Sequence, residues 1–360
     1  MTPFIRRVVT VAAAVSGVVL AIVWWRYVFP PAPPYTLHSR VGVSKGERIL
    51  VFAPHSDDET LGAGGLIRRA VQVGAVVRVV LVTNGDGFTL AAEDQFHSVH
   101  LTPEKYVQLA YIRQKETLTA LKLFGVPATA VTFLGFPDRG TPAEWEDNWS
   151  LTSPYTSRYT RLSHSPYRNS YVPNAPYSGA QLSAEIERII REFKPDTVIL
   201  PHPNDVHPDH WATHNFVLYA LATLDELGPK ASGGDRHTPR LLNYLVHRGN
   251  WPRPKGYVPR VELVPPPRLM SVGTRWSAFT LSRGETAQKY QAILEYRSQV
   301  AVMRRYLVSF ARANDLFGTL PPTSEVDPQM KTVLVDPVED TLGREAEGGA
   351  DLRGIELRAD

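Results

Sequence analysis

The sequence predicts an α/β fold: a Rossmann-like, three-layer parallel sheet in a single catalytic domain behind an N-terminal transmembrane helix. Short apolar runs of strand length, such as residues 49–54 and 76–83, alternate with longer amphipathic stretches. This alternation is typical of parallel strands that helices cover on both faces. A separate uncharged stretch, residues 8–25, predicts the membrane helix.

Composition excludes several classes of protein. The 360 residues are 43% hydrophobic and 21% charged, which excludes a disordered or fibrous chain. The absence of cysteine excludes disulfide scaffolds, Cys-ligated zinc, iron–sulfur clusters and thiol nucleophiles. The net charge is only +3, and no Lys/Arg block or RNA-binding signature occurs. We therefore expect no nucleic-acid partner.

Residues 1–29 are predicted to form an N-terminal membrane anchor. A helix over residues 8–25 would span roughly 27 Å, about the thickness of the hydrocarbon core of a bilayer. A cleaved signal peptide is the alternative, but the stretch ends in WWRYVFPP and lacks a small-x-small cleavage site. We favour an uncleaved single-pass anchor. The short basic tail that carries Arg6 and Arg7 favours a catalytic domain on the extracytoplasmic side.

The rest of the chain divides into three parts. Residues 30–46 begin with a Pro-rich run that is typical of a stiff spacer. Residues 47–320 form the predicted catalytic domain. Residues 321–360 hold ten acidic and four basic side chains without hydrophobic periodicity, which predicts a flexible acidic tail.

Within the domain, strands and helices are expected in alternation. Strands are expected at residues 49–54, 76–83, 130–134 and 197–200. Helices are expected at about residues 60–73, 103–124, 180–193, 285–299 and 301–313. Residues 140–180 interrupt the alternation with a loop insertion that contains five Tyr and two Trp. Such a loop suits either a sugar ligand, through flat aromatic faces, or a structural lid over the sheet edge.

Two segments gather ionisable side chains directly after predicted strands. The first is HSDDE at residues 55–59, and the second is HPNDVHPDH at residues 202–210. Ligands bind beyond the carboxyl ends of strands in open parallel sheets, and both segments fall at that edge. Capping of a helix N-terminus would explain an acidic pair alone. It does not explain three His and two Asp within nine residues.

These residue types suit a catalytic metal. Two imidazoles and one carboxylate, with a position left for water, are the pattern of catalytic zinc, and the same donors can hold Fe²⁺. The segments also offer a further carboxylate, which could take a proton from water, and a further His, which could protonate a leaving amine. The glycines at residues 62–65 lack the GxGxxG spacing of a dinucleotide site.

The two segments resemble the motifs of the LmbE-like, PIG-L de-N-acetylase family. HSDDE at 55–59 resembles the HPDDE motif of that family, and HPDH at 207–210 resembles its second motif. The similarity extends over about residues 48–317. It includes the TNGDG turn at 83–87, Arg113 with Glu116, and YRSQ at 296–299.

The resemblance implies a zinc site made by His55, Asp58 and His210. Zn²⁺ is the expected cofactor, and another divalent metal such as Fe²⁺ would also fit these donors. This sequence has Ser56 where the family motif has proline, which removes no ligand.

The resemblance also implies roles around the metal. Asp57 would be the general base that acts on metal-bound water. His207, oriented by Asp209, would stabilise the tetrahedral intermediate and protonate the leaving amine. Arg113 would lie near the sugar.

We therefore expect a zinc-dependent N-deacetylase. Its substrate would be an N-acetylglucosamine-type amino sugar in a glycoconjugate or glycolipid, and metal-bound water would attack the amide. One alternative is a zinc amidase that acts on another N-acyl compound. Another is a metal-bound glycan-binding module without turnover, for which the loss of Asp57 would be harmless.

Overall fold

The computed structural model describes residues 15–24, 37, 39–227, 238–270 and 273–320. It divides into two units, Met1–Thr36 and Leu37–Asp360. In the first unit residues 15–24 are helical. Among the described residues no helix has both the length and the apolar character needed to cross a bilayer. Part of the predicted span over 8–25, part of the predicted spacer over 30–46 and the predicted tail over 321–360 lie outside the described residues.

One sheet runs through the second unit, and the described residues contribute eight strands to it. The strands are β1 (Ser39–Arg40), β2 (Arg48–Ala53), β3 (Val76–Thr83), β4 (Val131–Phe136), β5 (Thr197–Pro201), β6 (Arg240–Tyr244), β7 (Arg275–Thr280) and β8 (Asn314–Thr319). Their order across the sheet is β1-β7-β8-β6-β5-β2-β3-β4. β1 lies within the segment predicted as spacer and pairs with β7 at the sheet edge.

Five neighbouring strands, β4, β3, β2, β5 and β6, are parallel. Leu50 of β2, for example, pairs with Arg78 of β3 on one side and Val198 of β5 on the other. The chain first adds β3 and β4 on one side of β2, and later adds β5 and β6 on the other. The carboxyl ends of β2 and β5 therefore lie at the topological switch point, where α/β proteins bind their ligands.

The sheet is mixed, which corrects the prediction of a parallel sheet. β8 runs antiparallel to both β6 and β7. Its first two residues, Asn314 and Asp315, are polar but buried, so β8 lacks the apolar run that identifies a buried strand in the sequence. Asp315 is stable there because Lys289 donates to its Oδ1 at 2.6 Å.

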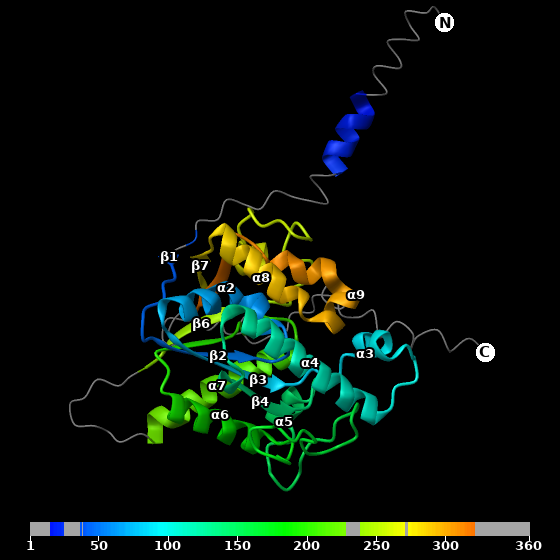
Figure 1. The fold of residues 1–360 in the computed structure, drawn as a ribbon, viewed down its shortest axis with the longest axis vertical. Coiled ribbons are helices and arrows are strands. Elements are labelled where there is room, and N and C mark those ends of the chain that lie inside the picture. Colours follow the sequence, from blue (N-terminus) through cyan, green and yellow to red (C-terminus); the bar gives the residue numbers. More distant parts are fainter. Residues whose placement is uncertain (1–14, 25–36, 38, 228–237, 271–272, 321–360) are drawn as a thin grey trace, which may run out of the picture. The chain divides into compact units, whose positions relative to one another are not determined.

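Helices cover both faces of the sheet. They are α2 (Asp58–Val73), α3 (Thr89–Phe96), α4 (Pro103–Phe124), α5 (Thr141–Glu146), α6 (Gly179–Phe193), α7 (Pro208–Leu227), α8 (Arg283–Leu294) and α9 (Arg297–Leu307). Short 3₁₀ turns lie at Ala128–Ala130, Pro267–Leu269 and Val308–Phe310. Figure 1 shows α2, α4, α8 and α9 on one side of the sheet and α5, α6 and α7 on the other. The mixed α/β, layered architecture is confirmed.

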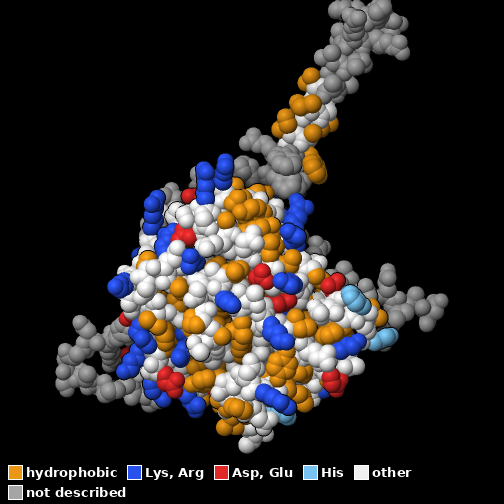
Figure 2. Space-filling model, in the orientation of Figure 1, with side chains coloured by type: hydrophobic (Ala, Val, Ile, Leu, Met, Phe, Trp, Pro, Cys, Tyr) orange, Lys and Arg blue, Asp and Glu red, His pale blue; other side chains and the backbone are white. Residues whose placement is uncertain are grey.

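The central strands are apolar throughout because both of their faces are covered. In β2 every residue from Ile49 to Ala53 is buried. Leu50 and Phe52 belong to the core cluster that includes Ile186 of α6 and Phe216 of α7. On the face drawn in Figure 2, Lys and Arg are dispersed among Asp, Glu and apolar side chains.

Candidate active site

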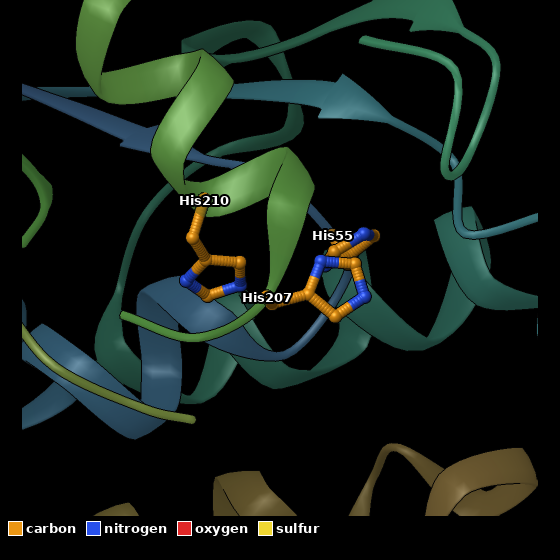
Figure 3. A group of neighbouring side chains, drawn as sticks. All are labelled: His55, His207 and His210. Carbon is orange, nitrogen blue, oxygen red and sulfur yellow. The ribbon is translucent and has the colours of Figure 1, made fainter. Parts of the chain in front are cut away.

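The three predicted metal ligands converge at the switch point. His55 lies in the loop after β2, Asp58 begins α2, and His210 lies in the first turn of α7. The distance from Asp58 Oδ2 to His55 Nδ1 is 3.2 Å, and that to His210 Nε2 is 3.0 Å. All three side chains are buried, and Figure 3 shows His55 and His210 with His207 between them in the view. Segments more than 150 residues apart therefore share one site.

The donor set fits a divalent metal. Asp58 Oδ1 is buried and has no hydrogen-bond partner among the described residues. Burial opposes the charged form of His210, but Asp205 and Asp58 outweigh it and raise the pKa of His210 to about 10. The carboxylates thus favour a positive charge at this position, which a divalent cation would supply. Two imidazole nitrogens and a carboxylate are the ligands of catalytic zinc.

Other residues could take part in metal binding at the same place. His207 has a ring nitrogen within 4.8 Å of nitrogens of His55 and His210. His55, Asp138, His207 and Asp209 form a second group that meets this distance, and Asp58, His210 and His247 form a third. Together these residues define a candidate metal centre.

The Asp205 carboxylate contacts the Nδ1 side of the His210 ring, whereas Asp58 contacts Nε2. Asp205 Oδ2 lies 3.1 Å from His210 Nδ1 and also accepts the backbone N–H groups of Val246 and His247, both at 2.9 Å. Its Oδ1 accepts the N–H of His207. A carboxylate on the second nitrogen of a metal-binding His fixes the ring orientation and makes the ligand more basic. The sequence analysis assigned no role to Asp205, although it lies inside the second motif segment.

Asp57 lies on the wall of the pocket in an unusual backbone conformation. Its φ is 114°, a value that residues other than glycine rarely adopt and that is found mainly at functional sites. Its carboxylate is 4.0 Å from Arg113 Nη2. Burial and the charge of Asp58 raise the pKa of Asp57 well above its usual range, against the effect of Arg113. A carboxylate of this kind is basic enough to accept a proton from water.

His207 and Asp209 are close together, but not in the arrangement that was expected. The backbone N–H of Asp209 donates to His207 Nδ1 at 3.2 Å, whereas its carboxylate Oδ2 is 3.9 Å from that nitrogen. The same Oδ2 is 3.0 Å from His55 Nε2, and Thr141 donates to Oδ1 at 2.6 Å. His207 is therefore oriented by the backbone of Asp209, and the Asp209 carboxylate lies against His55.

This contact determines the tautomer of His207. Because Nδ1 accepts a hydrogen bond, the neutral ring carries its proton on Nε2. Burial lowers the pKa of His207 well below its usual value, and the nearby His55 and His247 add to this effect. His207 lines the pocket, so the Nε2–H group is the part of the ring that remains for a ligand.

Arg113 connects the two loops that carry the site. From α4 its Nη1 donates to the carbonyl of Gly85 and its Nη2 to the carbonyl of Ser56, both at 2.8 Å. A Cβ on Gly85, which has a φ of 64°, would lie 1.8 Å from Arg113 Nη1, so this turn requires glycine. Arg113 Nε is buried and lacks a partner among the described residues. Arg113 lines the pocket, and its contact with the sugar, which the resemblance implies, stays a prediction.

Asp138 is a site residue that the sequence analysis missed. Its Oδ1 lies 3.4 Å from His55 Nε2, and its Oδ2 accepts the N–H of Gly87 at 3.0 Å. Burial disfavours the charged carboxylate, but His55 outweighs this effect, so the pKa of Asp138 lies well below its usual range. Asp138 follows β4 in the sequence FPD. The signal that could have found it was therefore an acidic residue after a third strand.

The aromatic insertion supports the site without lining it. No pocket-lining residue comes from 140–180. Trp145 and Trp149 pack on Phe216 of α7 instead. Tyr167 is buried and donates to Asp86 at 2.6 Å, and Asp86 accepts the N–H of Asp138. Of the two roles considered for this segment, the structure supports the structural one.

The residues of the candidate active site lie at a pocket of about 410 Å³. Asp57, His207 and Asp138 line it beside the candidate metal centre. The protein is therefore an α/β protein with a buried His/Asp cluster and a pocket at the switch point of its sheet. In this class of protein, such a place is a candidate metal-dependent active site.

The family follows from comparison with known sequences. Residues 50–221 match the model of the PIG-L family, which is described as GlcNAc-PI de-N-acetylase. This segment contains most of β2, all of β3 to β5, most of α7 and both motif segments. The predicted resemblance to the PIG-L family is therefore confirmed over this segment.

Curated relatives carry the name 1D-myo-inositol 2-acetamido-2-deoxy-alpha-D-glucopyranoside deacetylase. The protein from Mycobacterium sp. (strain KMS) is 31% identical over 185 residues, which are 51% of this chain and 53% of the relative. The protein from Kineococcus radiotolerans is 28% identical over 206 residues, 56% of this chain and 52% of the relative. The chain thus spans about half the length of the curated relatives it matches.

Solved structures also align with this chain, each at a TM-score below 0.5. A deacetylase of teicoplanin biosynthesis aligns with a TM-score of 0.48 and 19% identity, over 75% of this chain and 96% of its own. The N,N'-diacetylchitobiose deacetylase of Pyrococcus horikoshii aligns with a TM-score of 0.44 and 20% identity, over 81% and 88%. A 4-carboxy-2-hydroxymuconate hydratase also aligns, with a TM-score of 0.44 and 16% identity, over 78% of this chain and 98% of its own. These likenesses concern fold and do not assign an activity.

Proposed function

We propose that the protein is a metal-dependent N-deacetylase that hydrolyses the acetamido group of an N-acetylglucosamine-type amino sugar. The observation that carries the proposal is the convergence of His55, Asp58 and His210 beside a pocket that His55, Asp57 and His207 line. Metal-dependent amide hydrolysis requires metal-binding residues next to a basic carboxylate and a hydrogen-bond donor. The names of the family and of the curated relatives support an acetamido sugar as substrate.

The residues of the chain divide the reaction between them. A divalent metal held by His55, Asp58 and His210 would supply Lewis acidity, which makes water a nucleophile at neutral pH and polarises the amide carbonyl. Asp57 accepts the proton that the attacking water loses. The neighbouring Arg113 keeps the Asp57 carboxylate in place and holds the Ser56 carbonyl beside it.

His207 acts on the carbonyl oxygen and the leaving amine of the substrate amide. Its Nε2–H donates a hydrogen bond to the carbonyl oxygen as negative charge develops there. The proton that Asp57 took from water leaves with the amine, directly or through His207. Acetate and a free amino sugar are the products, and both groups return to their starting protonation states.

The proposal is tested on the full chain loaded with zinc. The assay measures acetate released from methyl N-acetylglucosaminide, and metal content is measured on the same samples. We expect about one zinc per chain and steady acetate release. Asp57→Asn should keep the metal and lose activity by a factor of about 100 or more. Asp58→Ala should lose both.

Asp94→Asn is the matched control, because Asp94 is an exposed carboxylate on α3 outside the pocket. It should match the native protein in both measurements. Full activity in Asp57→Asn would remove the assigned role of Asp57. Zinc binding without acetate release from any N-acetyl sugar would favour the non-catalytic module, and release from other N-acyl compounds alone would favour the amidase.

We also propose a membrane location through residues 8–25, with the catalytic domain on the extracytoplasmic side. The uncharged composition of that stretch supports the location. The test is fractionation of cells that express the full chain, followed by protease treatment of intact cells. Recovery in the membrane fraction with protease-sensitive residues 37–320 is expected, and recovery in the cytosolic fraction would reject the proposal.

A further inference from the structure

The pocket has a second, basic region in addition to the part beside the candidate metal centre. Arg248 and Lys255, both from the segment between β6 and β7, line it together with Tyr306 of α9. The acidic residues of the pocket lining are Asp57 and Asp138, and both belong to the metal end. The region around Lys255 thus carries positive charge without a carboxylate from the pocket lining.

Lys255 is the clearest member of this basic region. Its side chain is half-buried, and Nζ donates to the carbonyl of Trp251 at 3.0 Å. Nζ also lies 4.2 Å from the centroid of the Tyr306 ring. Among the described residues no carboxylate forms an ion pair with it. Burial lowers the pKa of Lys255 to about 8, and the cations Arg253 and Arg312 add to this effect. An anion bound here would favour the charged form of Lys255, and it would offset both the effect of burial and the repulsion from the two arginines.

A row of rings connects Lys255 with the metal end. The His247 ring lies 5.1 Å from the His207 ring and 4.7 Å from the His210 ring. The Tyr306 ring stacks on His247 at 6.3 Å with an interplanar angle of 14°. Lys255 Nζ lies against Tyr306, at the end of this row away from His207. A ligand that reaches Lys255 therefore extends beyond the sugar whose amide is at His207.

Part of the pocket lining is apolar. Phe88 and Leu90 contribute to it from the segment after β3, and Val302 and Met303 contribute to it from α9. Such a lining favours a linker that is itself largely apolar between the amino sugar and a charged group.

We propose that Lys255 and Arg248 form an anion-binding subsite that recognises a phosphate or carboxylate group on the aglycone of the amino sugar. The inference rests on the proposed function, because it assumes that the acetamido group lies at the metal end. It makes Lys255 a determinant of substrate specificity.

The test uses three hexyl glycosides of N-acetylglucosamine that differ only in the terminal group, which is hydroxyl, carboxylate or phosphate. KM is measured for each with the zinc-loaded full chain. In parallel, calorimetry measures the Kd of the corresponding deacetylated glycosides, which need no turnover. We expect at least one anionic glycoside to bind about tenfold more tightly than the hydroxyl glycoside, as a hydrogen-bonded charge pair allows.

Three variants locate the effect. Lys255→Gln should reduce the anionic-to-neutral ratio from about ten to about one, and Lys255→Arg should keep most of it. Arg253→Gln is the matched control, because Arg253 is an exposed cation nearby that does not line the pocket, and it should keep the ratio. The carboxylate and phosphate arms show which anion the subsite prefers.

Two results would overturn the subsite: equal affinities for all three glycosides in the native protein, or a preference that survives Lys255→Gln. Failure of the proposed function would look different. Calorimetry would then still show the preference and its loss in Lys255→Gln, while no glycoside released acetate.

Discussion

Two regions of the molecule bury charged side chains in opposite ways. Behind α2, Lys289 is fully buried and donates to Asp315 at 2.6 Å and to the carbonyl of Leu61 at 2.7 Å. Asp315 also accepts the N–H of Leu66, so this pair is satisfied within the protein. At the carboxyl ends of β2 and β5, carboxylates outnumber cations, and Asp58 Oδ1 has no partner among the described residues.

The difference separates residues that stabilise the fold from residues that bind a metal and act on a ligand. A satisfied buried pair holds elements together but has nothing to offer a ligand, whereas a region with unmet acceptors is arranged for a cation that comes from outside. The first region should therefore control unfolding, and the second should control metal binding and turnover. The following predictions test this division, from the largest expected effect to the smallest.

The largest effect is expected at the satisfied pair. Lys289→Met leaves Asp315 buried without its cation, which should lower the free energy of unfolding by about 3–5 kcal/mol. Urea unfolding followed by circular dichroism measures this change. The double variant Lys289→Met/Asp315→Leu should recover most of the loss, because it removes both charges. A single variant as stable as the native protein would show that the pair contributes nothing.

A pH-dependent effect is expected at Glu185 on α6. Burial raises the pKa of Glu185 to about 7, although Gln181 donates to its Oε1. The unfolded chain titrates this group near pH 4.5, so its contribution favours folding below that pH and is lost as the pH rises through 7. Glu185→Gln should therefore gain stability relative to the native protein between pH 5 and 8, by up to about 3 kcal/mol. Parallel unfolding curves at these pH values that showed no relative gain would contradict the assignment.

The next effect concerns the support of the metal centre. Asp205→Asn should weaken zinc binding by about 10–100-fold, because the carboxylate against His210 Nδ1 is lost. Competition with a chelator measures the affinity, and excess zinc should restore part of the activity. Asp94→Asn again serves as the surface control. Unchanged zinc affinity would mean that Asp205 serves only the backbone of the loop.

The smallest effect is expected in the insertion. Tyr167→Phe removes the hydrogen bond to Asp86 and should cost about 1 kcal/mol of stability. We expect kcat to fall a few-fold while KM changes little, because Asp86 holds the backbone of Asp138 next to His55. Tyr171→Phe, on a partly exposed tyrosine of the same insertion, is the matched control. Equal effects in both variants would indicate general loosening of the insertion.

Much of the fold could be predicted because its signals are local. The apolar runs of β2, β3 and β5 identify buried parallel strands, since both of their faces are covered. β8 could not be predicted in this way, because Asp315 is tolerated in a buried strand only through Lys289, which lies 26 residues earlier. The membrane span at 8–25 stays a prediction.

The site could be predicted in part for a related reason. Residues within the two motif segments are visible as clusters, and the parallel topology brings those clusters together. Asp138 stands alone in the sequence, so only its 3.4 Å distance to His55 identifies it. The aromatic content of the insertion suited sugar binding and packing equally well. The two roles were distinguished only by the packing of its aromatic side chains in the fold and by their absence from the pocket lining.

The sequence by itself determined the α/β class, the two motif segments and the family whose motifs they resemble. These properties depend on residue type and on spacing along the chain. The tertiary structure alone decided that the Asp209 carboxylate lies against His55, that Asp205 supports His210, and that Lys255 lies in the pocket. These relations depend on distances between side chains that are far apart in the chain, and such distances are set by packing and backbone direction rather than by local sequence.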